Sequence, residues 1–281
     1  MKQHLYHYTS IDTLKKILTN KSLRFTSLDS VDDLDEVETA DLKNFGRFCF
    51  VSCWTCDDSE SIPMWKMYTP DMQGVRIKMT AFPFKKYIIH PGEFSNQEPI
   101  ETYINARDRH EKNLPYILNY YPELIEVDYT EKEELLYPKI KTEITYVSTE
   151  SNFKSGQNKN QPQTTTKLSY EIKYIGVFKR KCWAFQKEWR YKIFLFPYTY
   201  REYCAVKTTE DHFRLAKRLE ETDYKLTEED LFLDLDDKAI SEMEILIGPR
   251  ATEDQVAEVT RIALLSGIDP NNIKKSTLRI R

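Results

Sequence analysis

Apolar side chains recur at helical spacing in three segments of the chain. The first covers residues 11–20 and follows Ser10, a suitable N-cap, so it is predicted to be a short amphipathic helix. The other two cover residues 208–221 and 252–266 and are predicted to be helices as well. The segment Ser61–Tyr68, with a proline near its first turn, is predicted to be a further short helix.

Strands are predicted where apolar and polar residues alternate or where aromatic residues cluster. Gly74–Met79 alternates apolar residues with Arg76 and Lys78, which is typical of a half-exposed strand. Phe48–Trp54 is rich in aromatic residues and is predicted to be a buried strand. The remaining predicted strands are Leu23–Ser27, Leu124–Tyr129, Leu168–Tyr174, Glu188–Phe196 and Glu244–Ile247.

The chain of 281 residues is predicted to form one domain, 1–281, with an insertion at about 82–166. The insertion holds many tyrosines and charges, and its segment 148–166 is rich in Ser, Thr, Asn and Gln. That composition predicts a mobile loop. The acidic stretch 29–43 is predicted to be a solvated loop or helix.

Composition narrows the class of protein. A hydrophobic content of 40% with 31% charged residues is typical of a globular chain. The net charge of −4 excludes a strongly basic nucleic-acid binder, although 41 Lys and Arg residues leave room for a local basic groove. No run is apolar enough for a membrane helix and the N-terminus has no signal-peptide core, so we expect a cytoplasmic protein without membrane contact.

The cysteines and glycines argue against several kinds of site. Only seven glycines are present and no Gly-rich phosphate loop occurs. Cys53 and Cys56 have a zinc-like spacing, but a second pair is missing, and Cys49 and Cys53 fall in an apolar strand where a thiol behaves as a small hydrophobe. We therefore expect reduced thiols and no metal.

Two segments carry candidate chemistry. If Trp183–Lys192 is extended, Gln186, Glu188 and Arg190 stand in a row on one face. The alternative is a solvent-exposed strand without function. His7 lies at the end of a short predicted strand before the helix N-cap, and the alternative there is a histidine satisfied by the turn. A hydrolase also stays open, although no nucleophile elbow occurs.

Several motifs together resemble a bacterial domain family of unknown function whose members open with His-Tyr-Thr-Ser. The motifs are His7-Tyr8-Thr9-Ser10, Phe50–Trp54, Met64-Trp65-x-x-Tyr68, Gly74-Val75, Gln186-x-Glu188-Trp189-Arg190 and Ile245–Pro249. They span nearly the whole chain except the insertion. The family is distantly similar to the mono-ADP-ribosyltransferase superfamily.

The resemblance implies an α+β fold with a split, twisted antiparallel β-core flanked by short helices. It implies that NAD is bound as a substrate, that Glu188 is the catalytic carboxylate and that Gln186 positions the acceptor. The residues implied to hold NAD are His7, Tyr8, Thr9, Ser52, Trp65, Tyr68 and Arg190. The middle motif departs from the family pattern, because Ser52-Cys53-Trp54-Thr55 matches Ser-Thr-Ser only loosely.

On this basis we expect NAD-dependent ADP-ribosyl transfer to a macromolecule, either protein or nucleic acid. Bacterial transferases of this kind often act as toxins or in phage defence, which implies an antitoxin protein as a further partner. The alternative is a non-catalytic nucleotide-binding or protein-interaction module of the same fold. The residue types suit the transfer chemistry, because a fixed carboxylate stabilises positive charge that develops on the ribose.

Overall fold

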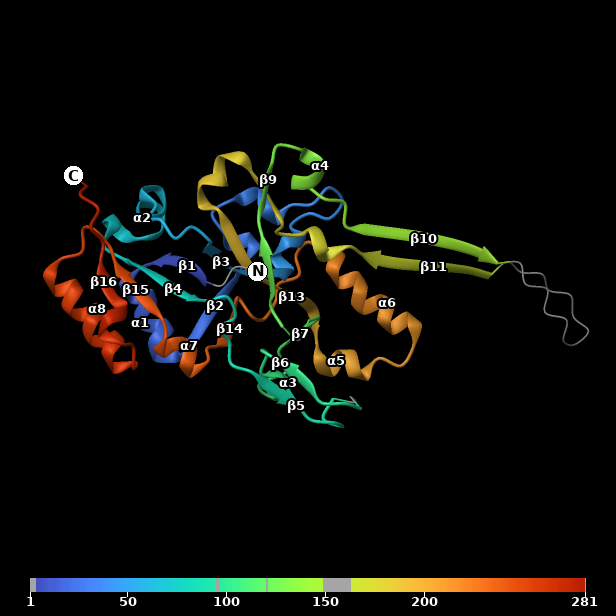
Figure 1. Ribbon diagram of the computed structural model, residues 1–281. Helices are drawn as coiled ribbons and strands as arrows, with labels where there is room; N and C mark the ends of the chain where they lie inside the picture. The colour runs from blue at the N-terminus through green and yellow to red at the C-terminus, as the bar shows by residue number, and fades with distance from the viewer. Residues whose placement is uncertain (1–3, 95–96, 120, 149–162, 281) are drawn as a thin grey trace, which may run out of the picture.

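The computed structural model describes residues 4–94, 97–119, 121–148 and 163–280. It is a mixed α+β structure built on a mostly antiparallel sheet, with helices packed around it (Figure 1). The helices are α1 Ile11–Asn20, α2 Ile62–Tyr68, α3 Ala106–Glu111, α4 Glu133–Leu136, α5 Tyr200–Ala205, α6 Thr209–Lys217, α7 Asp237–Ser241 and α8 Glu253–Leu265.

The main sheet has ten strands in the described part of the chain. Its members are β1 His4–Thr9, β2 Ser22–Ser27, β3 Cys49–Thr55, β4 Val75–Thr80, β7 Pro115–Ile117, β8 Glu123–Glu126, β13 Glu188–Thr199, β14 Asp230–Asp234, β15 Glu244–Ile247 and β16 Ile273–Lys275. Three separate pairs are formed by β5 Tyr87–Ile89 with β6 Ile100–Thr102, by β9 Asp128–Thr130 with β12 Phe178–Arg180, and by β10 Lys141–Ser148 with β11 Gln163–Tyr170.

The sheet divides at β3. One edge of β3 pairs with β13, from Glu188 opposite Thr55 to Phe194 opposite Cys49. The other edge is shared, because its first half pairs with β2 while Thr55 at its end pairs with Tyr6 of β1. One branch then continues through β2 to β14, and the other through β1 to β4, β15 and β16. The two branches diverge from the same strand and leave a cleft between them.

The principal core lies against both branches of the sheet, with Phe25 of β2 and Ile77 of β4 in the same cluster. Ser10 caps α1 by accepting a hydrogen bond from the backbone N–H of Thr13 at 3.0 Å, and the helix then buries Leu14 and Ile17. A capping box formed by Thr252 and Gln255 begins α8, whose apolar side packs against the same core. Burial of the apolar faces of α1 and α8 on the sheet stabilises this core.

Most elements agree with the sequence predictions. The four predicted helices correspond to α1, α2, α6 and α8, and the predicted strands at 23–27, 48–54, 74–79, 188–196 and 244–247 correspond to β2, β3, β4, β13 and β15. The alternation in β4 has the predicted consequence, since Val75, Ile77 and Met79 are buried while Arg76 and Lys78 are half-buried.

Three local predictions are wrong. The segment predicted as the strand Leu124–Tyr129 divides into β8 and β9, because the chain leaves β13 after Val127 and the backbone N–H of Asp128 donates to the carbonyl of Val177, beside β12, at 2.9 Å. The segment Leu168–Tyr174 is a strand only to Tyr170 and then forms a 3₁₀ turn. In the acidic stretch, Leu28–Ser30 and Leu34–Val37 form 3₁₀ turns, and the carboxylate of Glu36 is buried rather than solvated.

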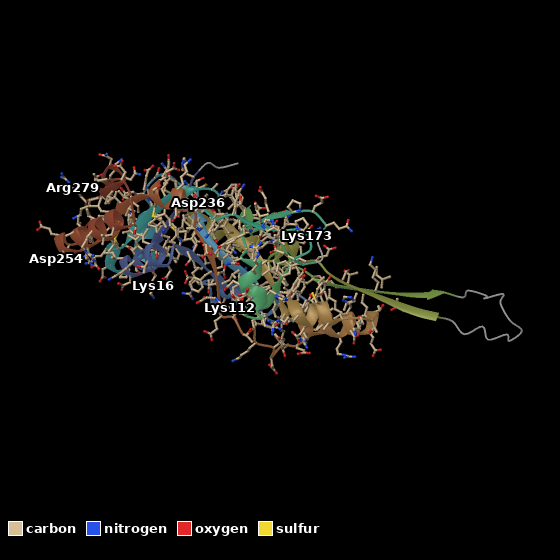
Figure 2. All side chains as sticks on the ribbon, turned by 90° about the horizontal axis from the view of Figure 1, so that it is seen from below. Lys16, Lys112, Lys173, Asp236, Asp254 and Arg279 are labelled. Carbon is tan, nitrogen blue, oxygen red and sulfur yellow. The ribbon has the colours of Figure 1, made fainter. Side chains whose placement is uncertain are left out.

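The segment 82–166, predicted to be an insertion, contributes to the main sheet. Its strands β7 and β8 both pair with β13. By contrast, the hairpin β10–β11 leaves the body of the protein beside α6 in both views (Figures 1 and 2). Of the stretch predicted to be a mobile loop, Gln163–Thr166 belongs to β11, and 149–162 lies outside the described residues. No helix in the described residues has the length and hydropathy needed to cross a membrane.

Candidate active-site cleft

The cleft between the two branches has a volume of about 220 Å³. It is lined by side chains from both branches and from the loop before η2, the 3₁₀ turn Leu34–Val37. Asp32 comes from that loop. The other lining residues include Tyr6, His7 and Tyr8 of β1, Cys53 and Trp54 of β3, Met64 and Tyr68 of α2, Lys179 of β12, and Gln186 and Glu188. Aromatic walls and a few polar groups at the floor are typical of a small-molecule site.

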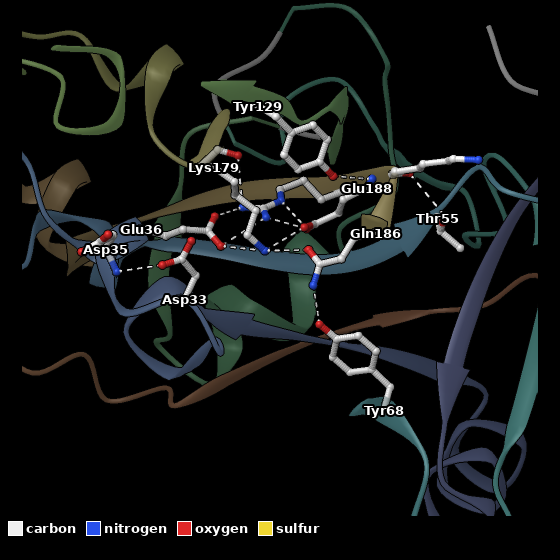
Figure 3. Close-up of polar contacts among 12 residues, drawn as sticks. Asp33, Asp35, Glu36, Thr55, Tyr68, Tyr129, Lys179, Gln186 and Glu188 are labelled. Carbon is white, nitrogen blue, oxygen red and sulfur yellow. Dashed lines mark hydrogen bonds and ion pairs between the residues drawn. The ribbon is translucent and has the colours of Figure 1, made fainter. Parts of the chain in front are cut away.

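Four charged side chains meet at the floor of the cleft (Figure 3). Glu188 Oε2 accepts a hydrogen bond from Lys179 Nζ at 2.9 Å, and Glu188 Oε1 accepts one from Arg190 Nε at 2.8 Å. Glu36 binds both cations as well, with Lys179 Nζ 3.1 Å from its Oε1 and the Arg190 guanidinium in direct contact. We call these residues the charge quartet: Glu36, Lys179, Glu188 and Arg190. Two carboxylates face two cations, so the quartet is neutral as a whole.

The quartet determines the ionisation of Glu188. Burial alone would raise the pKa of this carboxyl, but Arg190 and Lys179 beside it hold its pKa below the usual value of 4.5. Burial likewise opposes the charge on Lys179, and the two carboxylates still raise the pKa of its ammonium to about 12. Glu188 is therefore a carboxylate at neutral pH although it is buried.

A left-handed residue brings Gln186 and Glu188 to the same site. The segment Lys181–Gln186 is a 3₁₀ helix, Lys187 has φ +44°, and the strand begins only at Glu188. The prediction of an extended chain from Trp183 is therefore wrong. The turn nevertheless directs Gln186 and Glu188 into the cleft while the side chain of Lys187 stays exposed beside Asp57.

The alternative of a solvent-exposed charged strand is excluded by burial. The exposed fractions of Gln186, Glu188 and Arg190 are 4%, 3% and 0%. Charged groups are rarely buried to this extent unless they are paired, and here Glu188 and Arg190 are paired with each other.

His7 lies in the wall of the cleft in its neutral form. Its Nδ1 lies 2.8 Å from the carbonyl oxygen of Cys53, so Nδ1 must carry the proton and donate it. Burial lowers the pKa of the imidazole, and the bond to Cys53 offsets this only in part. The ring lies 5.1 Å from the ring of Trp54. The neutral imidazole therefore offers Nε2 as a hydrogen-bond acceptor.

Gln186 connects the floor of the cleft to α2. Its Oε1 accepts from Lys179 Nζ at 3.1 Å, and its Nε2 donates to the hydroxyl of Tyr68 at 2.5 Å. Because an ammonium can only donate, the amide has one orientation that satisfies both neighbours. Burial first, and then Asp32 beside it, raises the pKa of the Tyr68 hydroxyl, which is therefore protonated.

The remaining predicted site residues lie outside the lining of the cleft. Trp65 is fully buried behind Tyr8 and donates from Nε1 to Glu60 at 3.1 Å, so the prediction that it lines the pocket is corrected. Helical spacing explains this, because Met64 and Tyr68 share the cleft-facing side of α2.

Three further predicted residues, Ser52, Thr9 and Arg190, also lie behind the wall of the cleft. Ser52 accepts a hydrogen bond from Trp54 Nε1 at 3.1 Å and thereby fixes the indole that lines the cleft. Thr9 is buried in the ladder between β1 and β4, opposite Val75. Arg190 faces Glu188 and Glu36 rather than open space. Ser52 and Arg190 contact residues that line the cleft and do not line it themselves.

The sequence predictions missed Lys179, Glu36 and Trp54. Trp54 stands two residues beyond Ser52 on β3, so the alternation of that strand contained the signal. Glu36 was hidden in an acidic run, where charge usually indicates a solvated face. No local pattern marks Lys179, because its partners come from η2 and β13.

Neither a metal-binding cluster nor a comparison with known proteins assigns a function to the cleft. Within the described ranges, no group of three or more His, Cys, Asp or Glu side chains is arranged to hold a metal ion. Cys49 is buried and Cys53 lines the cleft, with burial raising the pKa of both thiols. No protein-family model, curated protein or solved structure matches the chain. The function must therefore be argued from the cleft.

Proposed function

We propose that the chain is an NAD-dependent ADP-ribosyltransferase that modifies a macromolecule, either protein or nucleic acid. The observation that carries the proposal is the ionised carboxylate of Glu188 at the floor of an aromatic cleft. A sheet that divides at β3 and opens a cleft at the division suits the ADP-ribosyltransferase-like core that the sequence motifs imply.

The proposed reaction breaks the bond between the nicotinamide nitrogen and C1′ of the ribose. Nicotinamide leaves with the bonding electron pair as a neutral molecule, and positive charge develops on the ribose. The acceptor then donates an electron pair to C1′ and releases its proton to solvent. The carboxylate of Glu188 faces the developing charge and stabilises it without having to reorient.

Other residues of the cleft have roles that follow from their hydrogen bonds. Nε2 of His7 is an acceptor for a ribose hydroxyl, since Nδ1 already donates to Cys53. Trp54 and Tyr68 provide aromatic surfaces for the nicotinamide ring. Gln186, beside Glu188, is available to orient the acceptor with the second N–H of its amide.

The setting of this activity follows from the motifs rather than from the cleft. We propose that the transfer takes place in the cytoplasm, onto a host or phage macromolecule. The role would be that of a toxin or a phage-defence protein, with an antitoxin protein as regulator.

A non-catalytic nucleotide-binding or protein-interaction module is the second candidate. It is favoured by one observation: both carboxylate oxygens of Glu188 are already bound by cations of the protein itself. In a purely structural role the quartet would tie η2, β12 and β13 together, and the cleft would bind its ligand unchanged.

Incubation with NAD labelled in its adenosine half and with total cell extract separates the candidates. Nicotinamide release is measured, and label is counted in separate protein and nucleic-acid fractions. The transferase releases nicotinamide and labels one fraction, and Glu188→Gln abolishes both effects. Binding of NAD without nicotinamide release would instead support the non-catalytic module, and the absence of both would remove NAD as the ligand.

A further inference from the structure

We infer that Lys179 is the positioning residue of the cleft, and that it holds Glu188 as a carboxylate facing the ligand and fixes the direction of the hydrogen bonds that run through Gln186 to Tyr68. This inference rests on the proposed function only in taking NAD as the ligand. The positioning itself is argued from the geometry around Lys179.

Lys179 has three partners from three parts of the chain. Its Nζ lies 2.9 Å from Glu188 Oε2, 3.1 Å from Gln186 Oε1 and 3.1 Å from Glu36 Oε1. The ammonium donates hydrogen bonds to Glu188 and Gln186, and it forms an ion pair with Glu36. The side chain is 6% exposed and lines the cleft, with its Nζ 5.1 Å from the ring centre of Trp183. Its position is therefore determined from every side.

Because Lys179 can only donate hydrogen bonds, it determines the direction of the hydrogen bonds of Gln186 and Tyr68 along the wall of the cleft. Since Nζ donates to Gln186 Oε1, the amide must turn its N–H group toward Tyr68. The oxygen of Tyr68 then accepts, and its own O–H proton points away from Gln186, with Asp32 in reach. The chain of donors therefore runs from the buried ammonium to an acidic group at the cleft. Without Lys179 the amide could adopt either orientation, and the direction would be lost.

Lys179 is one of two cations that hold Glu188 ionised, and the other groups facing Glu188 must be considered with it. They are Arg190 on the same strand, the Cys53 thiol on β3, the Tyr68 hydroxyl on α2 and the Tyr129 hydroxyl on β9. Glu36 on η2 contacts both cations of Glu188. Tyr129 accepts the backbone N–H of Glu188 at 2.8 Å. Arg190 and then Lys179 lower the pKa of Glu188, and Lys179 does so both through its charge and through its hydrogen bond. Because Glu36 shares both cations, Arg190 does not serve Glu188 alone, and loss of Lys179 should raise the pKa of Glu188.

The test compares Lys179→Met with Lys181→Met, which removes the same kind of charge from an exposed neighbour. The carboxyl titration of Glu188 is followed by NMR in protein carrying ¹³C-labelled glutamate, and its signal is assigned by its loss in Glu188→Gln. We expect the titration midpoint of Glu188 to rise by about one to three pH units in Lys179→Met, the effect of removing a close opposite charge. Lys179→Arg should restore the midpoint, and Lys181→Met should leave it unchanged.

Activity provides a second, separable readout. In Lys179→Met, the pH below which kcat for NAD cleavage falls should rise by the same number of pH units as the titration midpoint. The value of kcat near neutral pH should fall by about 10²-fold, as expected when a reacting group is misplaced, while KM for NAD changes little. If Lys179→Met does not fold, Glu36→Gln/Lys179→Met, which keeps the quartet neutral, is compared with Glu36→Gln.

The outcomes are distinct. An unchanged titration midpoint in Lys179→Met overturns the inference whether or not the protein cleaves NAD. A raised midpoint with no change in the pH below which kcat falls also overturns it, because Lys179 would then not act through Glu188. A raised midpoint in a protein that never cleaves NAD upholds the positioning of Glu188 and refutes the proposed transferase.

Discussion

Glu188 lies between two cations, and this decides what its replacement does. A carboxylate in a wet cleft can be removed at little cost in stability, whereas Glu188 is almost fully buried against Lys179 and Arg190. We expect Glu188→Gln to lower the rate of NAD cleavage by about 10²–10³-fold, the effect of losing one preorganised electrostatic group. It should also lower the free energy of unfolding by about 3–5 kcal/mol, because a positive charge stays buried without its partner.

Both effects are measured on purified protein, with NAD cleavage at a temperature where circular dichroism shows the variant folded. Lys187→Asn is the matched control, since Lys187 is the exposed neighbour and asparagine tolerates its left-handed backbone. Equal cleavage rates for the wild type and Glu188→Gln would make the carboxylate a structural group.

His7 gives the protein a specific dependence on pH. Burial lowers the pKa of its imidazole from 6.5 in the folded state, so the unfolded chain binds the proton more readily. The free energy of unfolding should therefore be fully retained above about pH 6.5 and fall as the pH drops through the folded pKa. In His7→Gln this contribution to the fall should be absent.

Denaturant titrations between about pH 5 and pH 8, where histidine changes charge, provide the measurement. His4→Gln, an exposed histidine on the same strand, is the control and should keep the wild-type slope. A His7→Gln slope equal to that of the wild type would mean that the folded protein accepts the proton on His7 without cost.

At the scale of elements, the charge quartet connects η2, β12 and β13. Removal of Glu188 alone leaves one excess positive charge, and Lys179→Met removes that excess. We therefore expect Glu188→Gln/Lys179→Met to be more stable than Glu188→Gln alone by about 0.5–3 kcal/mol, as for residues of one network. Chemical denaturation of the wild type, both single variants and the double variant gives the coupling energy directly. Additive losses would show that the two charges do not interact.

Gly74 directly precedes β4, and its backbone lies close to the end of β1 at Thr9. A Cβ atom at this position would lie 2.2 Å from the carbonyl oxygen of Thr9 and 2.6 Å from Cβ of Thr69. Gly74→Ala should therefore lower the free energy of unfolding by about 1–3 kcal/mol, as overpacking does. Thr80→Ala, at the exposed end of the same strand, should change it by less than about 0.5 kcal/mol. Unfolding midpoints of the two variants test this, and equal stabilities would show that the backbone gives way.

The elements differ in how far their sequences predict them. Helices α1 and α8 are predicted because a cap and a periodic apolar face act within one segment. The same holds for β4, whose alternation matches its burial. The break between β8 and β9 is not predicted, because it depends on a change of partner from β13 to β12, and both partners are distant in sequence.

The residues of the site differ in the same way in how far the sequence predicts them. Glu188 and His7 were identified from short motifs, and both line the cleft. Trp65 was assigned to the pocket on its residue type, whereas the orientation of α2 decides that Tyr68 and not Trp65 faces it. Lys179 acquires its role from three partners that only the folded chain brings together, so no pattern around it could have indicated that role.

At the scale of the whole molecule, NAD binding should stabilise the fold. The cleft is formed by both branches of the sheet, so a ligand that occupies it binds the native state and not the unfolded chain. A ligand at about 100 times its Kd adds roughly 2.7 kcal/mol to the free energy of unfolding. We expect Tm to rise steadily with NAD concentration in a thermal melt. A Tm that responds to an unrelated nucleotide but not to millimolar NAD would exclude NAD as the ligand.

The division of the sheet at β3 also determines when the cleft comes into existence during synthesis. Strand β3 and its partner β13 come from distant parts of the chain, and Thr55 and Lys187, which bond at the end of their ladder, are 132 residues apart. A nascent chain can form α1, β1 and β3 early, but the floor of the cleft waits for β12 and β13 to leave the ribosome. Truncated products that end before Glu188 thus lack the carboxylate and the turn that directs it. Under the proposed function, we expect no truncated product that ends before Glu188 to cleave NAD.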